Sequence, residues 1–223
     1  MVAPARPFVA IIGGSKVGDK LGVLRALLDV VDRMVVGGGM AFTFLAAQGH
    51  AVGASLLDAG RIDSCARLLE ESGDRIMLPT DIVALGPGGS FGPDGAEAGE
   101  VRMAGVDLAR GWRGLDIGPE TAGTFADEVA GAGSVFWNGP MGVFEDERFA
   151  AGTRTIARAV ADTEAFTVVG GGDSVAALDQ LGLVARIGYV STGGGASLEL
   201  LEHGDLPGLV ALRHASNAPA PGA

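Results

Sequence analysis

The sequence predicts an α/β fold with a doubly wound, mostly parallel sheet and helices on both of its faces. Short apolar runs alternate with longer stretches whose apolar residues recur at helical spacing. Glycine makes up 38 of the 223 residues, and its clusters repeatedly separate an apolar run from the helical stretch that follows. The strand-to-helix turns of a parallel sheet gather at one edge, where ligands bind. The pattern therefore predicts a crevice walled by glycine turns.

The first strand, turn and helix carry an unusual pair of lysines. Residues 8–12 predict a buried strand, and residues 21–28 predict a helix. The turn between them contains Gly14, Lys16 and Lys20, and these are the only lysines of the chain because the other 14 basic residues are arginines. Backbone N–H groups at a helix N-terminus and compact ammonium groups both favour a phosphate. The alternative is a tight turn with two solvated lysines.

The remaining elements repeat this alternation along the chain. Further strands are predicted at 33–36, 75–79, 81–85, 134–137, 165–169 and 187–191, with a short strand or loop at 114–118. Further helices are predicted at 40–48, 58–72 (with Asp58 as its N-cap), 120–130 with Pro119 in the first turn, 147–161, from about 174 to 181, and 196–202. Residues 86–99 predict a surface excursion, residues 1–212 a single domain, and residues 213–223 a disordered tail.

Composition narrows the class of protein. The net charge of −11 argues against nucleic-acid binding, but it leaves room for a nucleotide, which needs only a few local N–H groups and cations. A single cysteine, Cys65, excludes an internal disulfide and fits a cytoplasmic protein; its helical spacing favours a core thiol over a nucleophile. No apolar run reaches the roughly 18 residues of a membrane span, so no membrane partner is expected.

Three other glycine turns suggest chemistry, each with an ordinary alternative. Asp173 could hold magnesium together with nucleotide phosphates, or simply cap a helix. Residues 193–195 could offer bare backbone N–H groups to an anion, or form a flexible connector. Residues 138–145 could wall a base and reach a ribose through Glu145, or form an ordinary strand-to-helix loop. Together with the lysine turn, these segments predict a nucleotide crevice.

Six ordered motifs identify a family that this chain resembles. They lie at 6–20, 37–45, 114–119, 137–145, 170–174 and 190–202. Over 6–212 the chain is similar to the C-terminal, nucleotide-binding half of phosphoglycerate kinase, which has a Rossmann-like fold. The resemblance implies reversible phosphoryl transfer between 1,3-bisphosphoglycerate and MgADP in glycolysis. The chain departs from the family pattern at Ser15, where alanine is usual, and at Ser174, where threonine is usual.

The resemblance also implies a role for each matching residue. Lys16, Gly194 and Gly195 would act on the transferring phosphoryl group, and Asp173 would hold Mg²⁺. The nucleotide would contact Gly14, Ser15, Lys16, Lys20, Gly37, Gly38, Gly114, Leu115, Asn138, Pro140, Gly142, Val143, Glu145, Gly171, Gly172, Asp173, Ser174 and Gly193. Glu145 is expected at the ribose, and Gly37, Gly38, Gly114 and Leu115 at the adenine.

The family enzyme has a second, N-terminal half that binds phosphoglycerate and that this sequence does not match. We therefore expect such a half to be needed in cis or in trans, because the acceptor must be oriented for transfer. The chain is expected to be monomeric. A non-catalytic module that binds adenine nucleotides is the main alternative. A dehydrogenase is disfavoured because no Gly-x-Gly-x-x-Gly follows the first strand.

Overall fold

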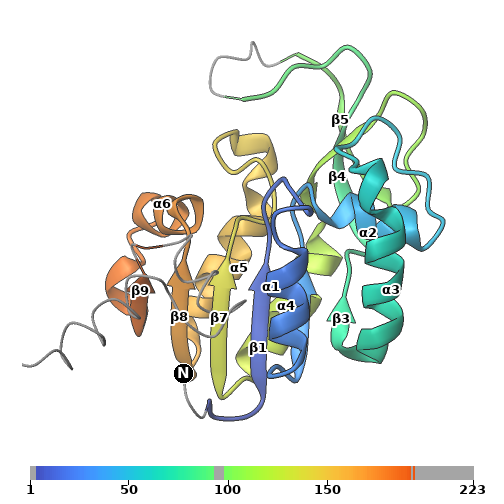
Figure 1. The fold of residues 1–223 in the computed structure, drawn as a ribbon. Coiled ribbons are helices and arrows are strands. Elements are labelled where there is room, and N and C mark those ends of the chain that lie inside the picture. The colour runs from blue at the N-terminus through green and yellow to red at the C-terminus, as the bar shows by residue number, and fades with distance from the viewer. Residues whose placement is uncertain (1–3, 93–97, 192, 194–223) are drawn as a thin grey trace, which may run out of the picture.

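A six-stranded, entirely parallel sheet forms the centre of the molecule (Figure 1). The structure is a computed structural model and describes residues 4–92, 98–191 and 193. The strands of this sheet, in spatial order, are β3 (Ile76–Met77), β2 (Arg33–Val36), β1 (Phe8–Ile12), β7 (Ser134–Asn138), β8 (Phe166–Gly170) and β9 (Tyr189–Ser191). The predicted α/β class and parallel sheet are confirmed.

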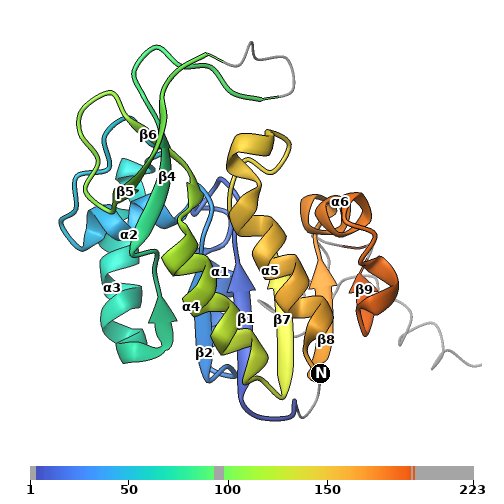
Figure 2. The same cartoon turned by 180° about the vertical axis from the view of Figure 1, so that it is seen from behind.

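Helices cover both faces of the sheet, as the two opposite views show (Figures 1 and 2). One buried cluster joins the sheet to α1 (Leu21–Leu28), α2 (Ala41–Ala47) and α3 (Ile62–Ser72). A second cluster on the other face joins it to α4 (Pro119–Ala130), α5 (Ala151–Asp162) and α6 (Gly172–Gln180). Short 3₁₀ turns lie at Ala59–Arg61, Gly73–Arg75, Glu147–Phe149 and Val184–Arg186.

Strand β1 shows why these segments are continuous apolar runs. Phe8, Ala10 and Ile12 face the α1–α3 cluster. Val9 and Ile11 face the opposite cluster, so every residue of the strand is buried. A central parallel strand with helices on both faces has no solvent side, and its sequence therefore does not alternate between apolar and polar residues.

A second, three-stranded antiparallel sheet was not predicted. It contains β5 (Val101–Gly105), β4 (Asp81–Leu85) and β6 (Arg113–Ile117), in that spatial order. The strand at 81–85 is confirmed, and the short strand or loop predicted at 114–118 is a strand, but no strand was expected at β5. Most of β5 is exposed, so it lacks the buried periodicity that marks a strand in sequence.

Several predicted boundaries differ from the structure. The stretch 58–72 begins as the 3₁₀ turn Ala59–Arg61, and the Asp58 side chain makes no capping hydrogen bond. The stretch 147–161 likewise begins as a 3₁₀ turn, and α5 starts at Ala151. Pro119 occupies the first turn of α4, as expected. The predicted helix at 196–202 and the tail at 213–223 lie outside the described residues.

The strand order places a topological switch between β1 and β7. From β1 the sheet extends through β2 to β3 on one side, and from β7 through β8 to β9 on the other. Such a switch leaves a crevice at the carboxyl ends of the two central strands.

Cys65 is fully buried in α3, which confirms it as a core thiol. Among the described residues, no helix is long and apolar enough to cross a membrane.

Candidate functional site

Backbone hydrogen bonds join the turns that follow β1, β2 and β7 into one layer. The N–H groups of Gly13 and Gly14 donate to the carbonyl oxygens of Asn138 and Pro140, both at 3.0 Å. The N–H of Gly38 donates to the carbonyl oxygen of Met141, also at 3.0 Å. The crevice floor is thus built from three segments that are far apart in sequence.

Two glycines in this layer have no room for a side chain. Gly139 has φ +100°, and an added Cβ would lie 2.3 Å from the carbonyl oxygen of Gly13. Gly38 has φ +66°, and its Cβ would lie 2.6 Å from the nitrogen of Gly14. L side chains disfavour these φ values, and the close contacts add a second penalty. These glycines are therefore required by the contacts between turns as well as by space for a ligand.

The Lys20 side chain forms hydrogen bonds to both strand ends at the topological switch. Its ammonium donates to the carbonyl oxygen of Gly13 at 2.7 Å and to the side-chain oxygen of Asn138 at 2.9 Å. A longer bond of 3.3 Å reaches the carbonyl oxygen of Asn138. Burial lowers the pKa of Lys20 to about 8, although the negative charge of Asp173 opposes the shift. Lys20 therefore places a partly desolvated positive charge at the crevice floor.

Lys16 has a different environment four residues earlier. Its side chain is exposed and lines the same crevice. Among the described residues its ammonium has no hydrogen bond or ion pair. The two lysines of the turn are thus not equivalent, because Lys20 is held by the protein and Lys16 is available to a ligand.

Two adjoining cavities open from this layer, and both are lined by Gly14, Ser15 and Asp173. The first has a volume of about 590 Å³ and the second about 500 Å³. The first also contains the predicted residues Gly38, Gly114, Leu115, Pro140, Gly142, Val143 and Glu145. The second also contains the predicted residues Lys16, Lys20, Asn138, Gly171, Gly172 and Ser174.

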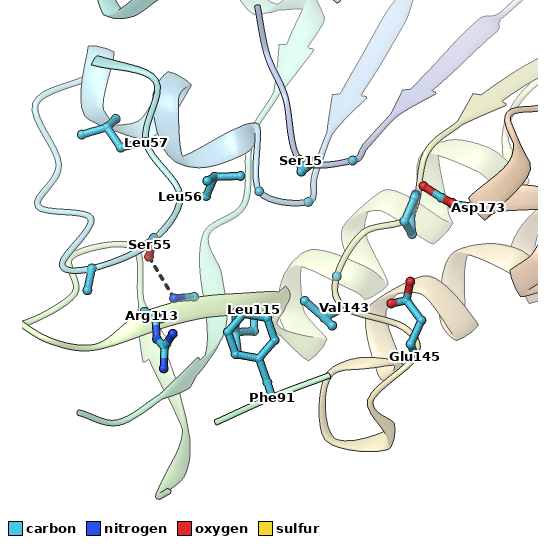
Figure 3. Close-up of a pocket in the computed structure, with 17 residues that line it drawn as sticks. Ser15, Ser55, Leu56, Leu57, Phe91, Arg113, Leu115, Val143, Glu145 and Asp173 are labelled. Atoms are coloured by element: carbon cyan, nitrogen blue, oxygen red, sulfur yellow. Dashed lines mark hydrogen bonds between the residues drawn. The ribbon is translucent and has the colours of Figure 1, made fainter. Parts of the chain in front are cut away.

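The first cavity is largely apolar, with a carboxylate among its lining residues (Figure 3). Leu115 and Val143 contribute apolar side chains, and Glu145 is exposed. The backbone N–H of Gly114 is held by the Ser55 hydroxyl at 2.9 Å, and a Cβ on Gly114 would collide with the Phe42 ring. An apolar slot with few polar groups suits a flat aromatic ring with a polar substituent.

Sequence reasoning missed several residues of this cavity. They are Ala54, Ser55, Leu56, Leu57, Phe91 and Arg113. Leu56 and Leu57 are exposed by 54% and 41%. They lie in an irregular connection, where no periodicity marks them. Only the presence of large apolar residues in a predicted loop could have pointed to them.

The second cavity is polar and carries an unused donor. The Nδ2 atom of Asn138 is buried and has no hydrogen-bond partner among the described residues. Gly171 lies beside it, since a Cβ on Gly171 would come within 3.2 Å of this nitrogen. The Ser174 hydroxyl accepts a hydrogen bond from the Gly139 N–H at 2.6 Å. A buried, unpaired amide donor is costly, and an anionic oxygen in the cavity would satisfy it.

Asp173 stands between the two cavities in the first turn of α6. Its side chain is exposed, and no group of three or more potential metal ligands occurs among the described residues. A lone carboxylate does not form a protein-only metal cage. It does suit Mg²⁺, which commonly takes one or two carboxylates, phosphate oxygens and water.

Four predicted residues do not line the described cavities or cannot be placed. Gly37 is buried behind the wall, where its Cβ would lie 2.5 Å from the Met141 sulfur. Gly193 is exposed after β9 and lines neither cavity. Gly194 and Gly195 lie outside the described residues.

A buried carboxylate behind the first cavity was also missed. Asp116 on β6 is only 3% exposed and accepts hydrogen bonds from the N–H groups of Gly152 at 2.7 Å and Ile117 at 2.9 Å. Burial raises its pKa to about 7 despite these bonds and the nearby charge of Arg154. Gly142 packs so closely that its Cβ would lie 2.3 Å from an oxygen of Asp116. Asp116 thereby fixes the start of α5 against the strand that supports the cavity.

Comparisons with known proteins give a consistent result. The family model described as "Phosphoglycerate kinase" matches residues 1–204. The phosphoglycerate kinases of Frankia alni and Parafrankia sp. are 57% and 58% identical to the chain; each alignment covers 94% of this chain and 51% of the relative. A solved structure of phosphoglycerate kinase from Coxiella burnetii has a TM-score of 0.87 at 40% identity, covering 96% of this chain and 54% of that one. The chain thus spans about half the length of the relatives it matches.

Proposed function

Because the chain belongs to the phosphoglycerate kinase family, we propose that it is the nucleotide-binding half of such an enzyme and binds MgADP and MgATP. The observation that carries the proposal is the pair of adjoining cavities with Gly14, Ser15 and Asp173 in common. One cavity is largely apolar and the other contains two lysines, and a nucleotide has a corresponding division between its base and its phosphates. Both cavities lie at the switch of a doubly wound sheet, where such ligands bind.

The nucleoside occupies the first cavity in this proposal. The adenine lies between the side chains of Leu115 and Val143, with backbone of Gly38 and Gly114 at its edge. Glu145 accepts hydrogen bonds from the ribose hydroxyls at the open side. These contacts orient the nucleotide so that its phosphates enter the second cavity past Ser15 and Asp173.

The phosphates occupy the second cavity. The Lys20 charge offsets part of their negative charge, and the Asn138 Nδ2 donor and the backbone of Gly171 and Gly172 provide hydrogen bonds. Asp173 would hold Mg²⁺, and the ion would supply positive charge to the phosphates. Lys16, whose ammonium is available to a ligand, stabilises the charge that develops on the phosphoryl group during transfer.

Phosphoryl transfer requires a second half that binds the phosphoglycerate. Positioning two reactants contributes up to roughly 7–11 kcal/mol to catalysis. In our proposal the other half of the enzyme supplies this positioning, in cis or in trans. The reaction is then transfer between 1,3-bisphosphoglycerate and ADP, a step of glycolysis.

Titration calorimetry with ADP, with and without Mg²⁺, tests the binding claim. We expect saturable binding that is stronger with Mg²⁺ and weaker in Lys16→Ala. Arg110→Ala is the matched control, because it removes an exposed cation outside both cavities. Absence of ADP binding by the unaltered chain would overturn the proposal.

A coupled assay of ATP formation from 1,3-bisphosphoglycerate tests the catalytic claim. We expect turnover when the other half of a related enzyme is added, and no turnover by this chain alone. Binding that is indifferent to Mg²⁺ and to Lys16→Ala, with no turnover in the mixture, would instead favour a module that only binds adenine nucleotides.

A further inference from the structure

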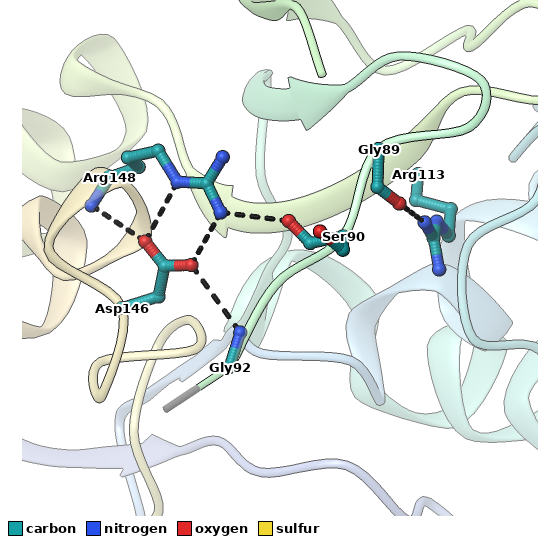
Figure 4. A network of polar contacts seen from close by, with 6 residues as sticks. All are labelled: Gly89, Ser90, Gly92, Arg113, Asp146 and Arg148. Carbon is teal, nitrogen blue, oxygen red and sulfur yellow. Dashed lines mark hydrogen bonds and ion pairs between the residues drawn. The ribbon is translucent and has the colours of Figure 1, made fainter. Parts of the chain in front are cut away.

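Asp146 and Arg148 form an ion pair beside the first cavity (Figure 4). Arg148 donates to both carboxylate oxygens of Asp146, from Nε at 2.9 Å and from Nη2 at 2.7 Å. The Arg148 backbone N–H adds a third bond at 3.1 Å. The Arg148 side chain is 20% exposed and the Asp146 side chain 9%. A two-bond contact between a guanidinium and a carboxylate is the strong form of such an ion pair.

The pair also captures the backbone of a separate segment, residues 89–92. Arg148 Nη2 donates to the carbonyl oxygen of Ser90 at 2.8 Å, and the N–H of Gly92 donates to Asp146 at 3.4 Å. From the other side, the Arg113 guanidinium donates to the carbonyl oxygen of Gly89. Figure 4 shows these bonds, which join residues 89–92 to Arg113 on one side and to Asp146 and Arg148 on the other.

Phe91 lies between these anchored residues and lines the first cavity. Leu115 lines the same cavity (Figure 3), and the Arg113 guanidinium carbon lies 5.1 Å from the centre of the Phe91 ring. Val143 and Glu145 line the same cavity and come just before Asp146 in sequence. The ion pair therefore ties the segment that carries Phe91 to the loop that carries Val143 and Glu145.

Neither Asp146 nor Arg148 lines the cavity itself. We propose that they are positioning residues, which hold Phe91 as a wall for the base of the nucleotide. This inference rests on the proposed function. The segment lies outside both large buried clusters, so its position depends on polar bonds more than on core packing. A preformed wall spares the ligand the entropy cost of ordering it on binding.

Removing one partner of the pair leaves the other charge partly buried and frees the segment. We therefore expect Arg148→Gln and Asp146→Asn each to weaken ADP affinity about three- to tenfold. Inorganic pyrophosphate has no base, so its affinity should stay unchanged in both variants. Calorimetry with the two ligands on the full chain separates loss of base recognition from general damage to the site.

Glu147→Gln is the matched control. It breaks the ion pair in which Arg154 Nη2 lies 2.6 Å from Glu147 Oε2. Glu147 belongs to the same 3₁₀ turn as Arg148, but this ion pair does not involve residues 89–92. Affinity for ADP should not change in this variant. Arg148→Lys keeps the positive charge but loses the fork, and an intermediate loss is expected. This second variant keeps the test available if Arg148→Gln does not fold.

A double-mutant cycle with Phe91→Ala tests whether the pair acts through Phe91. In that background Arg148→Gln should cost no further ADP affinity. Equal losses for ADP and pyrophosphate, or an undiminished cost of Arg148→Gln without Phe91, would overturn the inference while leaving the proposed function intact. Failure of the unaltered chain to bind ADP would overturn both.

Discussion

The ammonium of Lys20 and the side-chain oxygen of Asn138 lie 2.9 Å apart and connect the turn after β1 to the end of β7. These are the two strands at which the sheet reverses its winding. The bond fixes the position of the Lys20 positive charge in the crevice. The amide nitrogen of Asn138 is left buried and without a hydrogen-bond partner among the described residues.

The lowered pKa of Lys20, about 8, makes ADP binding dependent on pH. A bound phosphate favours the charged ammonium and raises this pKa, so binding should take up protons above pH 8. We expect ADP affinity to fall as pH rises from about 8 to 10. Below that range Lys20 is charged with or without ADP, so its titration should not change the affinity. Calorimetry at pH 9 in two buffers of different ionisation enthalpy measures the uptake. Lys20→Gln should abolish it, whereas uptake that persists in this variant would assign it to another group.

Asp116 should make the folded state less stable as pH rises towards neutrality. Its pKa is raised from 3.8 to about 7 in the folded state, so between these values the folded protein holds a proton that the unfolded chain has released. Stability from this group is therefore lost between about pH 4 and pH 7 and then levels off. The free energy of unfolding lost through this group is at most roughly 4 kcal/mol, since each unit of pKa difference corresponds to about 1.4 kcal/mol.

Urea unfolding of the unaltered chain and of Asp116→Asn across pH 4 to 8 measures this effect. The difference between the two curves should change over that range and become constant above about pH 7. Parallel curves would mean that Asp116 is charged in the folded protein throughout.

Gly139→Ala should destabilise the protein strongly. The residue has φ +100°, and the new methyl carbon would lie 2.3 Å from a backbone oxygen. We expect a loss of at least about 2 kcal/mol, since strained backbone and a steric collision add. Gly123→Ala is the matched control, because Gly123 lies inside α4 with no atom near an added Cβ, and it should stabilise by roughly 0.5–1 kcal/mol. Similar thermal unfolding of the two variants would contradict this account of the crevice floor.

Asp173→Asn should reduce the benefit of Mg²⁺ for ADP binding. The carboxylate lies between the two cavities, where a cation shared with phosphates would sit. We expect the ratio of affinities with and without Mg²⁺ to fall about tenfold, which corresponds to about 1.4 kcal/mol. Affinity measured without Mg²⁺ should stay the same or rise, because a negative charge near the phosphates is removed. A Mg²⁺ effect of unchanged size would exclude Asp173 as the ligand.

Much of the architecture was predictable because the relevant signals are local. The apolar run at 8–12 and the glycines after it mark a buried parallel strand and its turn, whatever the rest of the chain does. The cavity residues predicted on those turns, from Gly14 to Ser174, do come together. Their functional roles rest on the family resemblance and are still predictions.

The missed features depend on contacts between distant segments. Strand β5 has an exposed surface and exists because β4 offers it a hydrogen-bonding edge. Phe91 and Leu56 belong to the first cavity only because two irregular segments pass over it. Nothing in the residues next to Asp146 predicts that its carboxylate would bind the backbone of Gly92.

The sequence by itself determined the fold class, the order of most strands and helices, and the glycine turns at the crevice. Periodicity and backbone conformation are properties of neighbouring residues, so they can be recognised without knowing the rest of the chain. The tertiary structure alone decided that Lys20 is held by Asn138 while Lys16 is available. It also decided that Asp116 is buried and that Asp146 and Arg148 bind the backbone of Gly92 and Ser90. Burial and charge environment arise from groups brought together across the fold, and no local pattern specifies them.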